Sequence, residues 1–464
     1  MPRFQGAETG TGGGLAALTA YRWVVLAGLL LMLGANLPGH MTVDSVIQLF
    51  EGRNGVHLTF NPPIMAWLLG RFDDLVPGTG LYVTACAALL SASLLGLAAL
   101  RPRTSWIGVV LTAGVLLTPQ LVVYQAIVWK DVLFANLSVA GFLCVAFAVR
   151  DWTRPTARIL PLATAVLLLA AAGLARQNGL ICDLMAALAL AWAARGGGWR
   201  SSALWGAGFF AVVLLTNHAI GLAVQPPGTT MASDTRKGVR VLEHYDIVGA
   251  LAHDPKLRLD VVAKTQPAAA AQIRTRGVRV YSPQRVDTLQ EDPGFPRALW
   301  DLPDDLAQAQ WRDIVVHHTG AYLAHRFDVF RWMVAPPDID RCLPYTTGVD
   351  GPPDMMAALD LPHGWEPQDT AMGNYVTWFI DTPLYSHIVY GAVALGVALI
   401  LMLRRDPVDV VIAAMMLAGL GFAASFFLIS VACDFRYLYF LDVAAMAGLL
   451  YLALDPPIAS RRSA

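Results

Sequence analysis

The chain has 464 residues, of which 56% are hydrophobic and only 14% are charged, and its formal net charge is −1. Soluble domains carry roughly 25% charged residues, so this composition excludes a soluble globular protein and predicts a polytopic membrane protein. The near-zero net charge averages unlike regions and indicates no nucleic-acid partner.

Ten apolar segments are each about as long as the roughly 20 residues that a helix needs to cross a bilayer. We expect them at about 21–38, 80–100, 105–122, 131–149, 159–175, 180–194, 202–221, 384–403, 408–430 and 437–454. The predicted fold class is therefore an all-α polytopic membrane protein with about ten transmembrane helices. Residues 1–20, which begin with a Gly/Thr-rich stretch, are predicted to be a disordered cytoplasmic N-terminus.

Most arginines in the short connections fall on one side of the predicted membrane. They are Arg101, Arg103, Arg150, Arg154, Arg158, Arg195, Arg200, Arg404, Arg405, Arg461 and Arg462. Cytoplasmic loops collect Arg and Lys, so this side is predicted to be the cytoplasm, and both termini lie there. The Arg-rich loops and Ala/Leu-rich spans indicate a bacterial inner (plasma) membrane.

The first of two long outward segments covers residues 39–79. Asp44, Gln48 and Glu51 are spaced at i, i+4 and i+7, so a helix would place them on one face. Apolar residues would occupy the other face, which favours a helix that lies at the bilayer interface. After a pair of prolines, a second short helix is predicted at 64–71.

The second outward segment, residues 224–383, contains most of the acidic residues of the chain. Its length of about 160 residues is enough for a small domain, but its Pro-rich stretches indicate an extracytoplasmic lid that packs on the rest of the protein. An aromatic helix is predicted at 322–332. The remaining regions are a transmembrane module at 21–223 and C-terminal transmembrane helices with a short cytoplasmic tail at 384–464.

Three basic residues, Lys130, Arg176 and Arg436, fall on the outward side, each at the end of a predicted helix. They do not help to set the topology, and an anionic ligand is one reason for charges at this boundary. Structural explanations stay open. Lys130 can pair with Asp131, Arg436 can pair with Asp434, and both arginines can extend toward lipid headgroups.

The sequence motifs around these residues are Trp129-Lys130-Asp131, Arg176-Gln177-Asn178-Gly179, His244-Tyr245-Asp246-Ile247 and Arg436-Tyr437. Together with an acid in a two-helix first outward loop and a large outward insert after about seven spans, they form a pattern. It resembles the GT-C superfamily of integral-membrane glycosyltransferases, which includes the protein mannosyltransferases and the aminoarabinose and arabinose transferases.

The resemblance implies a transferase that moves a sugar from a polyprenyl-phosphate donor to an acceptor glycan, lipid or protein on the extracytoplasmic face. In that superfamily an aspartate of the first outward loop lies at the catalytic centre, and the matching position here is Asp44. Many members carry two adjacent acids, whereas Asp44 is followed by Ser45, and the next acid is Glu51. This departure leaves the need for a divalent cation open.

The chemistry assigns roles to these residues. Asp44 is the candidate base, with Glu51 as a second carboxylate or a solvated residue, and Lys130, Arg176 and Arg436 are candidates for binding the donor phosphate. Further substrate-binding candidates are His57, Asp131, Asn178, Tyr437, His244 and Asp246. A single carboxylate opposite a phosphate leaving group favours direct displacement with inversion. Structural alternatives are a helix-dipole interaction for Asp44 and a structural hydrogen bond for His244 and Asp246.

Two other classes of protein compete with the transferase. A transporter or a lipid or glycolipid flippase would also bind anions and contact membrane lipids, but its spans tend to carry Gly/Pro breaks near the bilayer midplane. Here the prolines cluster in loops. A non-catalytic scaffold would leave Asp44 and the three basic residues unexplained.

The five cysteines are scattered without metal-binding spacing, so we expect neither a disulfide framework nor a zinc site. Asp183 and Asp442 lie inside predicted spans, where an ionisable group is costly and often functional. Either can also pair with Arg176 or Arg436.

Overall fold

The computed structural model describes residues 12–456 except 60 and 363. Across these residues the chain is built from helices, and pairing between extended segments is limited to isolated bridges. The predicted all-α fold class is confirmed. Helix α1 (Gly12–Asn36) covers residues 12–20, which were predicted to be disordered; residues 1–11 of that segment lie outside the described residues.

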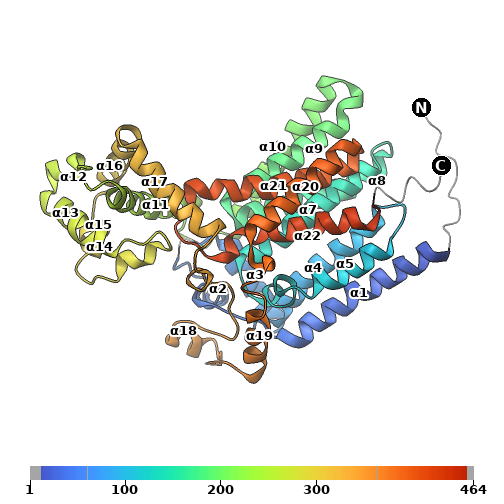
Figure 1. Cartoon of the computed structure of the whole chain (residues 1–464), viewed down its shortest axis with the longest axis horizontal. Coiled ribbons are helices and arrows are strands. Elements are labelled where there is room, and N and C mark those ends of the chain that lie inside the picture. The colour runs from blue at the N-terminus through green and yellow to red at the C-terminus, as the bar shows by residue number, and fades with distance from the viewer. Residues whose placement is uncertain (1–11, 60, 363, 457–464) are drawn as a thin grey trace.

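A bundle of long apolar helices forms one end of the molecule, and the insert helices from α11 (Met231–His253) to α17 (Thr319–Val334) extend to the other (Figure 1). Within the described residues, nine helical segments are long and apolar enough to cross a membrane, and a bent pair brings the number to ten. The nine contain α1, α4 (Gly80–Ala99), α7 (Lys130–Arg150), α8 (Pro155–Ala175), α9 (Leu180–Ala193), α10 (Trp199–Val224), α20 (His387–Arg404), α21 (Pro407–Ile429) and α22 (Tyr439–Leu454). Each overlaps one predicted span.

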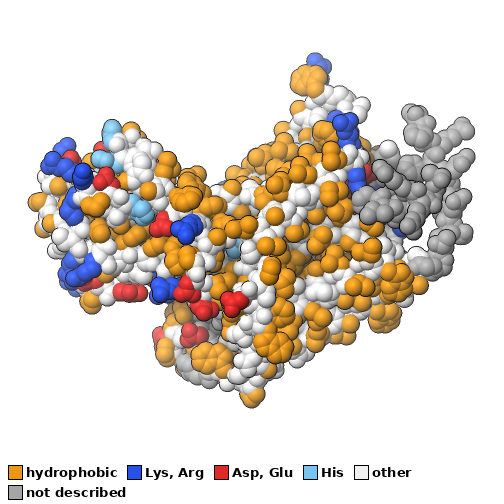
Figure 2. Space-filling view, viewed as in Figure 1, with side chains coloured by type: hydrophobic (Ala, Val, Ile, Leu, Met, Phe, Trp, Pro, Cys, Tyr) orange, Lys and Arg blue, Asp and Glu red, His pale blue; other side chains and the backbone are white. Residues whose placement is uncertain are grey.

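The outer surface of this bundle is apolar. Figure 2 shows hydrophobic side chains spread over the bundle, whereas Lys, Arg, Asp and Glu gather mainly over the insert. Leu204, Leu215 and Leu403 are 73%, 69% and 82% exposed. Exposed apolar surface of this extent is typical of helices that face lipid.

The span predicted at 105–122 is a bent pair. Helices α5 (Trp106–Leu116) and α6 (Pro119–Val122) meet at 70°, because Pro119 cannot continue the hydrogen bonding of α5. Ser105, before α5, donates its backbone N–H to the carbonyl of Leu454 at the end of α22 (2.9 Å). Gln120 in α6 accepts from the Tyr439 hydroxyl at the start of α22 (2.7 Å). The pair therefore runs the full length of α22 and forms one crossing.

The first outward segment forms α2 (Val43–Asn54) and α3 (Pro63–Leu75). Helix α2 was predicted to lie at the bilayer interface with one polar and one apolar face, but both faces are buried, with Val46 at 0% and Gln48 at 2% exposure. A Cβ added at Gly52 would lie 2.0 Å from the carbonyl oxygen of Ala66 in α3. The close approach that this glycine allows covers α2 with α3, so the prediction for α2 is wrong.

The second outward segment has two parts. Helices from α11 (Met231–His253) to α17 (Thr319–Val334) enclose a hydrophobic core of their own, whereas buried residues from Met333 to Tyr385 belong to the core of the bundle. The expectation of a lid without its own core therefore fails for the first part. The helices of the segment are α11, α12 (Asp260–Thr265), α13 (Pro267–Gln272), α14 (Val278–Val280), α15 (Pro296–Trp300), α16 (Asp304–His317), α17, α18 (Pro353–Ala358) and α19 (Pro367–Thr377).

A disulfide joins Cys342 of the insert to Cys433, which lies just before α22. No disulfide framework was expected from the spacing of the cysteines, and this pair shows that the expectation was wrong. The two cysteines are 91 residues apart, so only the packing of the insert on the end of α21 brings them together. Cys433 is three residues before Arg436, and the bridge therefore anchors the insert beside the candidate site.

Candidate active site

The arginines predicted to bind phosphate meet at the end of the bundle that packs against the insert. Arg436, in the short helix η8 (Phe435–Leu438), donates from Nη2 to Asp44 Oδ2 (2.9 Å) and from Nε to Asp434 Oδ2 (3.1 Å). Arg176, directly after α8, forms an ion pair with Asp131. Asp131 Oδ2 also lies 3.9 Å from Arg436 Nε. The predicted convergence is confirmed for Arg176 and Arg436, which share one carboxylate, and the pair Arg436–Asp434 is also present.

Lys130 starts α7 beside this cluster, and its charge contributes to the electrostatics of Asp44. Its ammonium donates to the side-chain oxygen of Asn61. Asp131, the expected partner of Lys130, forms its ion pair with Arg176 instead. Sequence reasoning missed Asn61 as a site residue. Its place before two prolines in the outward loop was the available signal.

A cavity of about 840 Å³ opens next to Arg436. Most of its lining residues are polar or charged by type, and they come from the first outward loop, the insert and the segment before α22. The lining residues are Thr42, Val43, Asp44, Gln284, Arg285, Asp287, Asp340, Arg341, Leu343, Thr346, Asp350, Asp434 and Arg436. Asp44 has a side chain that is 42% exposed. Residues of both outward segments therefore line one cavity together with Asp44.

Asp44 and Asp434 flank the same arginine and have opposite pKa shifts. Burial by itself would raise the pKa of Asp44, but the charges of Arg436 and Lys130 outweigh it and lower the pKa below its ordinary value. Burial raises the pKa of Asp434, with help from Asp131 and Asp44 and against Arg436. The site therefore favours the ionised form of Asp44 and makes Asp434 easier to protonate than an ordinary aspartate.

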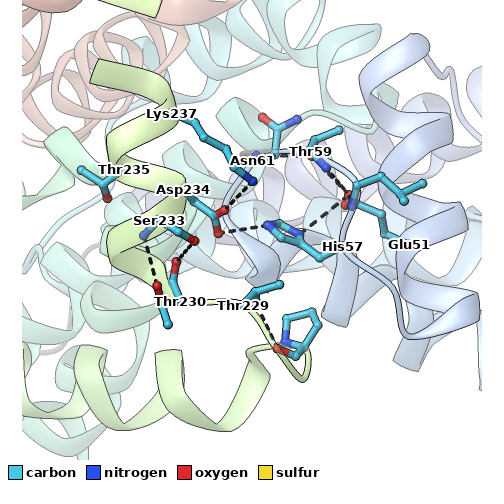
Figure 3. Close-up of polar contacts among 12 residues, drawn as sticks. Glu51, His57, Thr59, Asn61, Thr229, Thr230, Ser233, Asp234, Thr235 and Lys237 are labelled. Atoms are coloured by element: carbon cyan, nitrogen blue, oxygen red, sulfur yellow. Dashed lines mark hydrogen bonds and ion pairs between the residues drawn. The ribbon is translucent and has the colours of Figure 1, made fainter. Parts of the chain in front are cut away.

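Glu51 in α2 and His57 in the loop that joins α2 to α3 lie near each other (Figure 3) and are absent from the cavity wall. Glu51 is 2% exposed, so it is not the solvated residue that was one of its two predicted roles. Its Oε1 accepts from the backbone N–H groups of Leu58 (2.6 Å) and Thr59 (2.9 Å). His57 lies between Glu51 and Asp234 of α11, with Nε2 at 3.0 Å from Asp234 Oδ2. Both residues hold the loop together.

Tyr437 and Asn178 lie close to the arginines. The Tyr437 ring stacks on Phe426 at 5.6 Å, and the Arg176 guanidinium lies 4.7 Å from its centre. Asn178 donates to the hydroxyl of Ser425 in α21 (3.0 Å). Tyr437 therefore supports Arg176 through a cation–π contact, and Asn178 fixes the segment after Arg176 to α21.

His244 and Asp246 were expected at the substrate site, but they lie in the core of the insert. Both are 0% exposed. Burial, followed by the charge of Arg240, lowers the pKa of His244 to about 3. Asp246 pairs with Arg326 and accepts from Trp311 (2.7 Å). The polar residues of this motif are typical of an exposed helix face, but α16 and α17 pack on α11 and bury them.

The two acids inside the spans do not pair with the arginines. Asp442 accepts from His387 Nδ1 (2.9 Å) in the buried interface of α20 and α22. Asp183 is 2% exposed in α9. Within residues 12–456, apart from 60 and 363, no group of three or more His, Cys, Asp or Glu residues has an arrangement that could hold a metal ion.

No protein-family model matches the chain, and no curated protein matches it in sequence. Among solved structures it resembles the archaeal oligosaccharyltransferase AglB from Archaeoglobus fulgidus in complex with an inhibitory peptide and a dolichol-phosphate. The TM-score is 0.43 at 13% identity, over 96% of this chain and 51% of that one. A structure of the Archaeoglobus fulgidus oligosaccharyltransferase tethered to an acceptor peptide with an NVT sequon gives 0.44 and 13%, over 94% and 49%.

The chain thus spans about half the length of these structures. What the fold and the site define directly is a polytopic helical membrane protein with a charged cavity at one end of its bundle.

Proposed function

We propose that the protein is a GT-C-type membrane glycosyltransferase that moves a sugar from a polyprenyl-phosphate donor to an extracytoplasmic acceptor. The observation that carries this proposal is the contact between Asp44 and Arg436 in the cavity wall, with Arg176 behind it on Asp131. A carboxylate and a cluster of cations at one place are what transfer from a phosphate-linked donor requires.

The reaction is a single displacement. The acceptor hydroxyl oxygen bonds to the anomeric carbon while the bond from that carbon to the phosphate oxygen breaks. Asp44 takes the hydroxyl proton, and the phosphate leaves with the bonding electrons, opposite Arg436 and Lys130. Arg436 can hold two phosphate oxygens through parallel hydrogen bonds. Because the reaction is one displacement, the configuration at the anomeric carbon is inverted in the product.

The cavity wall favours a hydrophilic acceptor that carries hydroxyl groups. Only two of its thirteen lining residues, Val43 and Leu343, are apolar. An acyl chain or an apolar peptide would leave the charged wall without partners, which costs free energy for each unpaired group. Among glycan, lipid and protein acceptors, this wall fits a glycan best.

Two features support an outward position of the site. The disulfide Cys342–Cys433 lies beside it, and disulfides persist in oxidising compartments outside the cytoplasm. The arginines expected in the cytoplasm lie at the other end of the bundle, where Arg101 pairs with Asp409 and Asp455. The charge rule and the disulfide therefore agree on orientation.

The packing of the bundle favours a transferase over a transporter or flippase. One turn into α7, the ring of Phe134 stacks on Phe422 at 4.7 Å and packs edge-on against Phe440 at 5.2 Å. A transport path would continue from the cavity through this region. Close-packed aromatic rings fill it instead.

Two variants of the purified protein test the proposal with a defined donor and acceptor. Asp44→Asn keeps the shape of the side chain and removes the proton acceptor, so kcat should fall by about 10²–10⁴. Lys130→Met should raise the donor KM, because it removes a cation that faces the phosphate. Asp74→Asn, an exposed change in the same outward segment, is the control. Near wild-type transfer by Asp44→Asn would refute the catalytic assignment.

A further inference from the structure

The insert contacts the loop beneath Lys130 through a buried set of polar side chains. We propose that Asp234 of the insert, acting through His57 and Glu51, positions Lys130 for the donor phosphate. The inference rests on the proposed function, and it makes the insert part of the donor site as well as of the acceptor cavity.

The first step of the coupling crosses between segments 177 residues apart. His57 Nε2 lies 3.0 Å from Asp234 Oδ2, and its Nδ1 lies 3.7 Å from Glu51 Oε1. The side chains of His57, Glu51 and Asp234 are 2%, 1% and 6% exposed. The imidazole is hydrogen-bonded to Asp234, and its Nδ1 lies at ion-pair distance from Glu51 without a hydrogen bond, so a shift of α11 reaches the loop through this ring (Figure 3).

The second step runs through the loop itself. Glu51 Oε1 accepts three hydrogen bonds, from the N–H groups of Leu58 and Thr59 and from the Thr59 hydroxyl (3.2 Å). The Thr59 oxygen in turn accepts from the backbone N–H of Asn61 (3.3 Å). The Asn61 side chain then accepts from the Lys130 ammonium. An unbroken series of contacts thus joins Asp234 to Lys130.

The same turn of α11 reaches the other donor motif. Gln177, next to Arg176, donates to the hydroxyl of Thr235 (3.2 Å). One turn of the insert therefore contacts the neighbours of both Lys130 and Arg176. A lysine has a flexible four-carbon chain, so fixing it before the donor arrives reduces the entropic cost of binding phosphate.

The test is a comparison of donor binding and turnover. Asp234→Ala and Asn61→Ala should each weaken polyprenyl-phosphate binding and raise the donor KM about tenfold, the size of one lost hydrogen bond to a charged group. At saturating donor, kcat should fall no further than in Lys130→Met, because Asp44 is untouched and the ammonium is still present. Asp234→Asn, which keeps a hydrogen-bond acceptor, should recover most of the affinity. Asp260→Ala, an exposed change elsewhere in the insert, should match wild type.

Coupling predicts that the effects do not add. The double variant Asn61→Ala/Asp234→Ala should bind donor as each single variant does, and Asp234→Ala should have no further effect in Lys130→Met. Additive losses, or donor binding unchanged in Asp234→Ala, would overturn the inference. A role in folding alone would lower kcat and thermal stability together without a selective change in donor KM.

A second readout separates this inference from the proposed function. The chain has four lysines, at 130, 237, 256 and 264, so the rate of amine modification of Lys130 can be followed by peptide mass spectrometry. Asp234→Ala should change that rate even without substrate. A wild-type protein that fails to bind polyprenyl phosphate contradicts the proposed function, whereas an unchanged rate at Lys130 contradicts the positioning role.

Discussion

Two carboxylates on one arginine illustrate how environment assigns roles at the level of single residues. Asp44 faces the cavity and contacts Arg436, whereas Asp434 is mostly buried beside the same guanidinium. Their pKa shifts have opposite signs for that reason. An ionised Asp44 suits a proton acceptor, and protonation of Asp434 would leave more of the positive charge of Arg436 for a phosphate.

These signs predict how kinetics depend on pH. The pKa of Asp44 is below its ordinary value of 3.8, so its carboxylate is lost only as pH falls below that value, and kcat should show no loss from Asp44 in mild acid. The pKa of Asp434 is raised, so this group gains its proton in milder acid and the donor KM should then decrease. Steady-state kinetics over a pH series measures both constants.

Asp434→Asn provides the matched control for that series. The amide cannot ionise, so the donor KM of this variant should be low and should not change across the range in which Asp434 titrates. A donor KM in Asp434→Asn that still follows the wild-type pH dependence would assign the titration to another group.

At the level of elements, α11 combines two functions on one helix. Its first turns contact the loop under Lys130 through Asp234, and its later turns carry His244 and Asp246 into the core of the insert. Arg326 is fully buried, pairs with Asp246 and donates to the carbonyl of Ser430 (2.7 Å). This pair therefore links α11, α17 and the end of α21.

Asp246→Ala should destabilise the protein strongly without a selective effect on donor or acceptor. Removing one partner of a buried ion pair leaves Arg326 unpaired, at a cost of about 3–5 kcal/mol. Thermal unfolding of the purified protein and its yield from membranes measure the loss, with Asp260→Ala as the exposed control. A wild-type unfolding temperature combined with a raised KM would instead return Asp246 to the substrate site.

At the level of the whole molecule, the arginines at one end and the cavity at the other predict how the protein is oriented in the membrane. Arg103→Cys and Asp260→Cys place exposed thiols at these opposite ends. In intact cells, a membrane-impermeant thiol reagent should label Asp260→Cys and should label Arg103→Cys only after the membrane is opened. Labelling of both from outside would refute the predicted topology, including the crossing formed by α5 and α6.

Much of the architecture was open to prediction from sequence because the bilayer imposes it locally. A crossing helix must be apolar over a fixed length, so the ten spans could be located from composition alone, with α5–α6 differing only by the bend at Pro119. The predicted outward positions of Lys130, Arg176 and Arg436 are exceptions to the rule that Arg and Lys collect in cytoplasmic loops. These exceptions indicated the site from sequence.

Tertiary structure decided which of these residues meet and which polar groups are buried. Glu51 and Asp246 have the same local signature as Asp44, a carboxylate on an outward helix, but only Asp44 opens into the cavity. The disulfide Cys342–Cys433 and the contacts of Asn61 and Asp234 also join segments distant in sequence. Sequence determined the helices because those depend on neighbouring residues and lipid. The site depends on side chains brought together by packing, which no local pattern encodes.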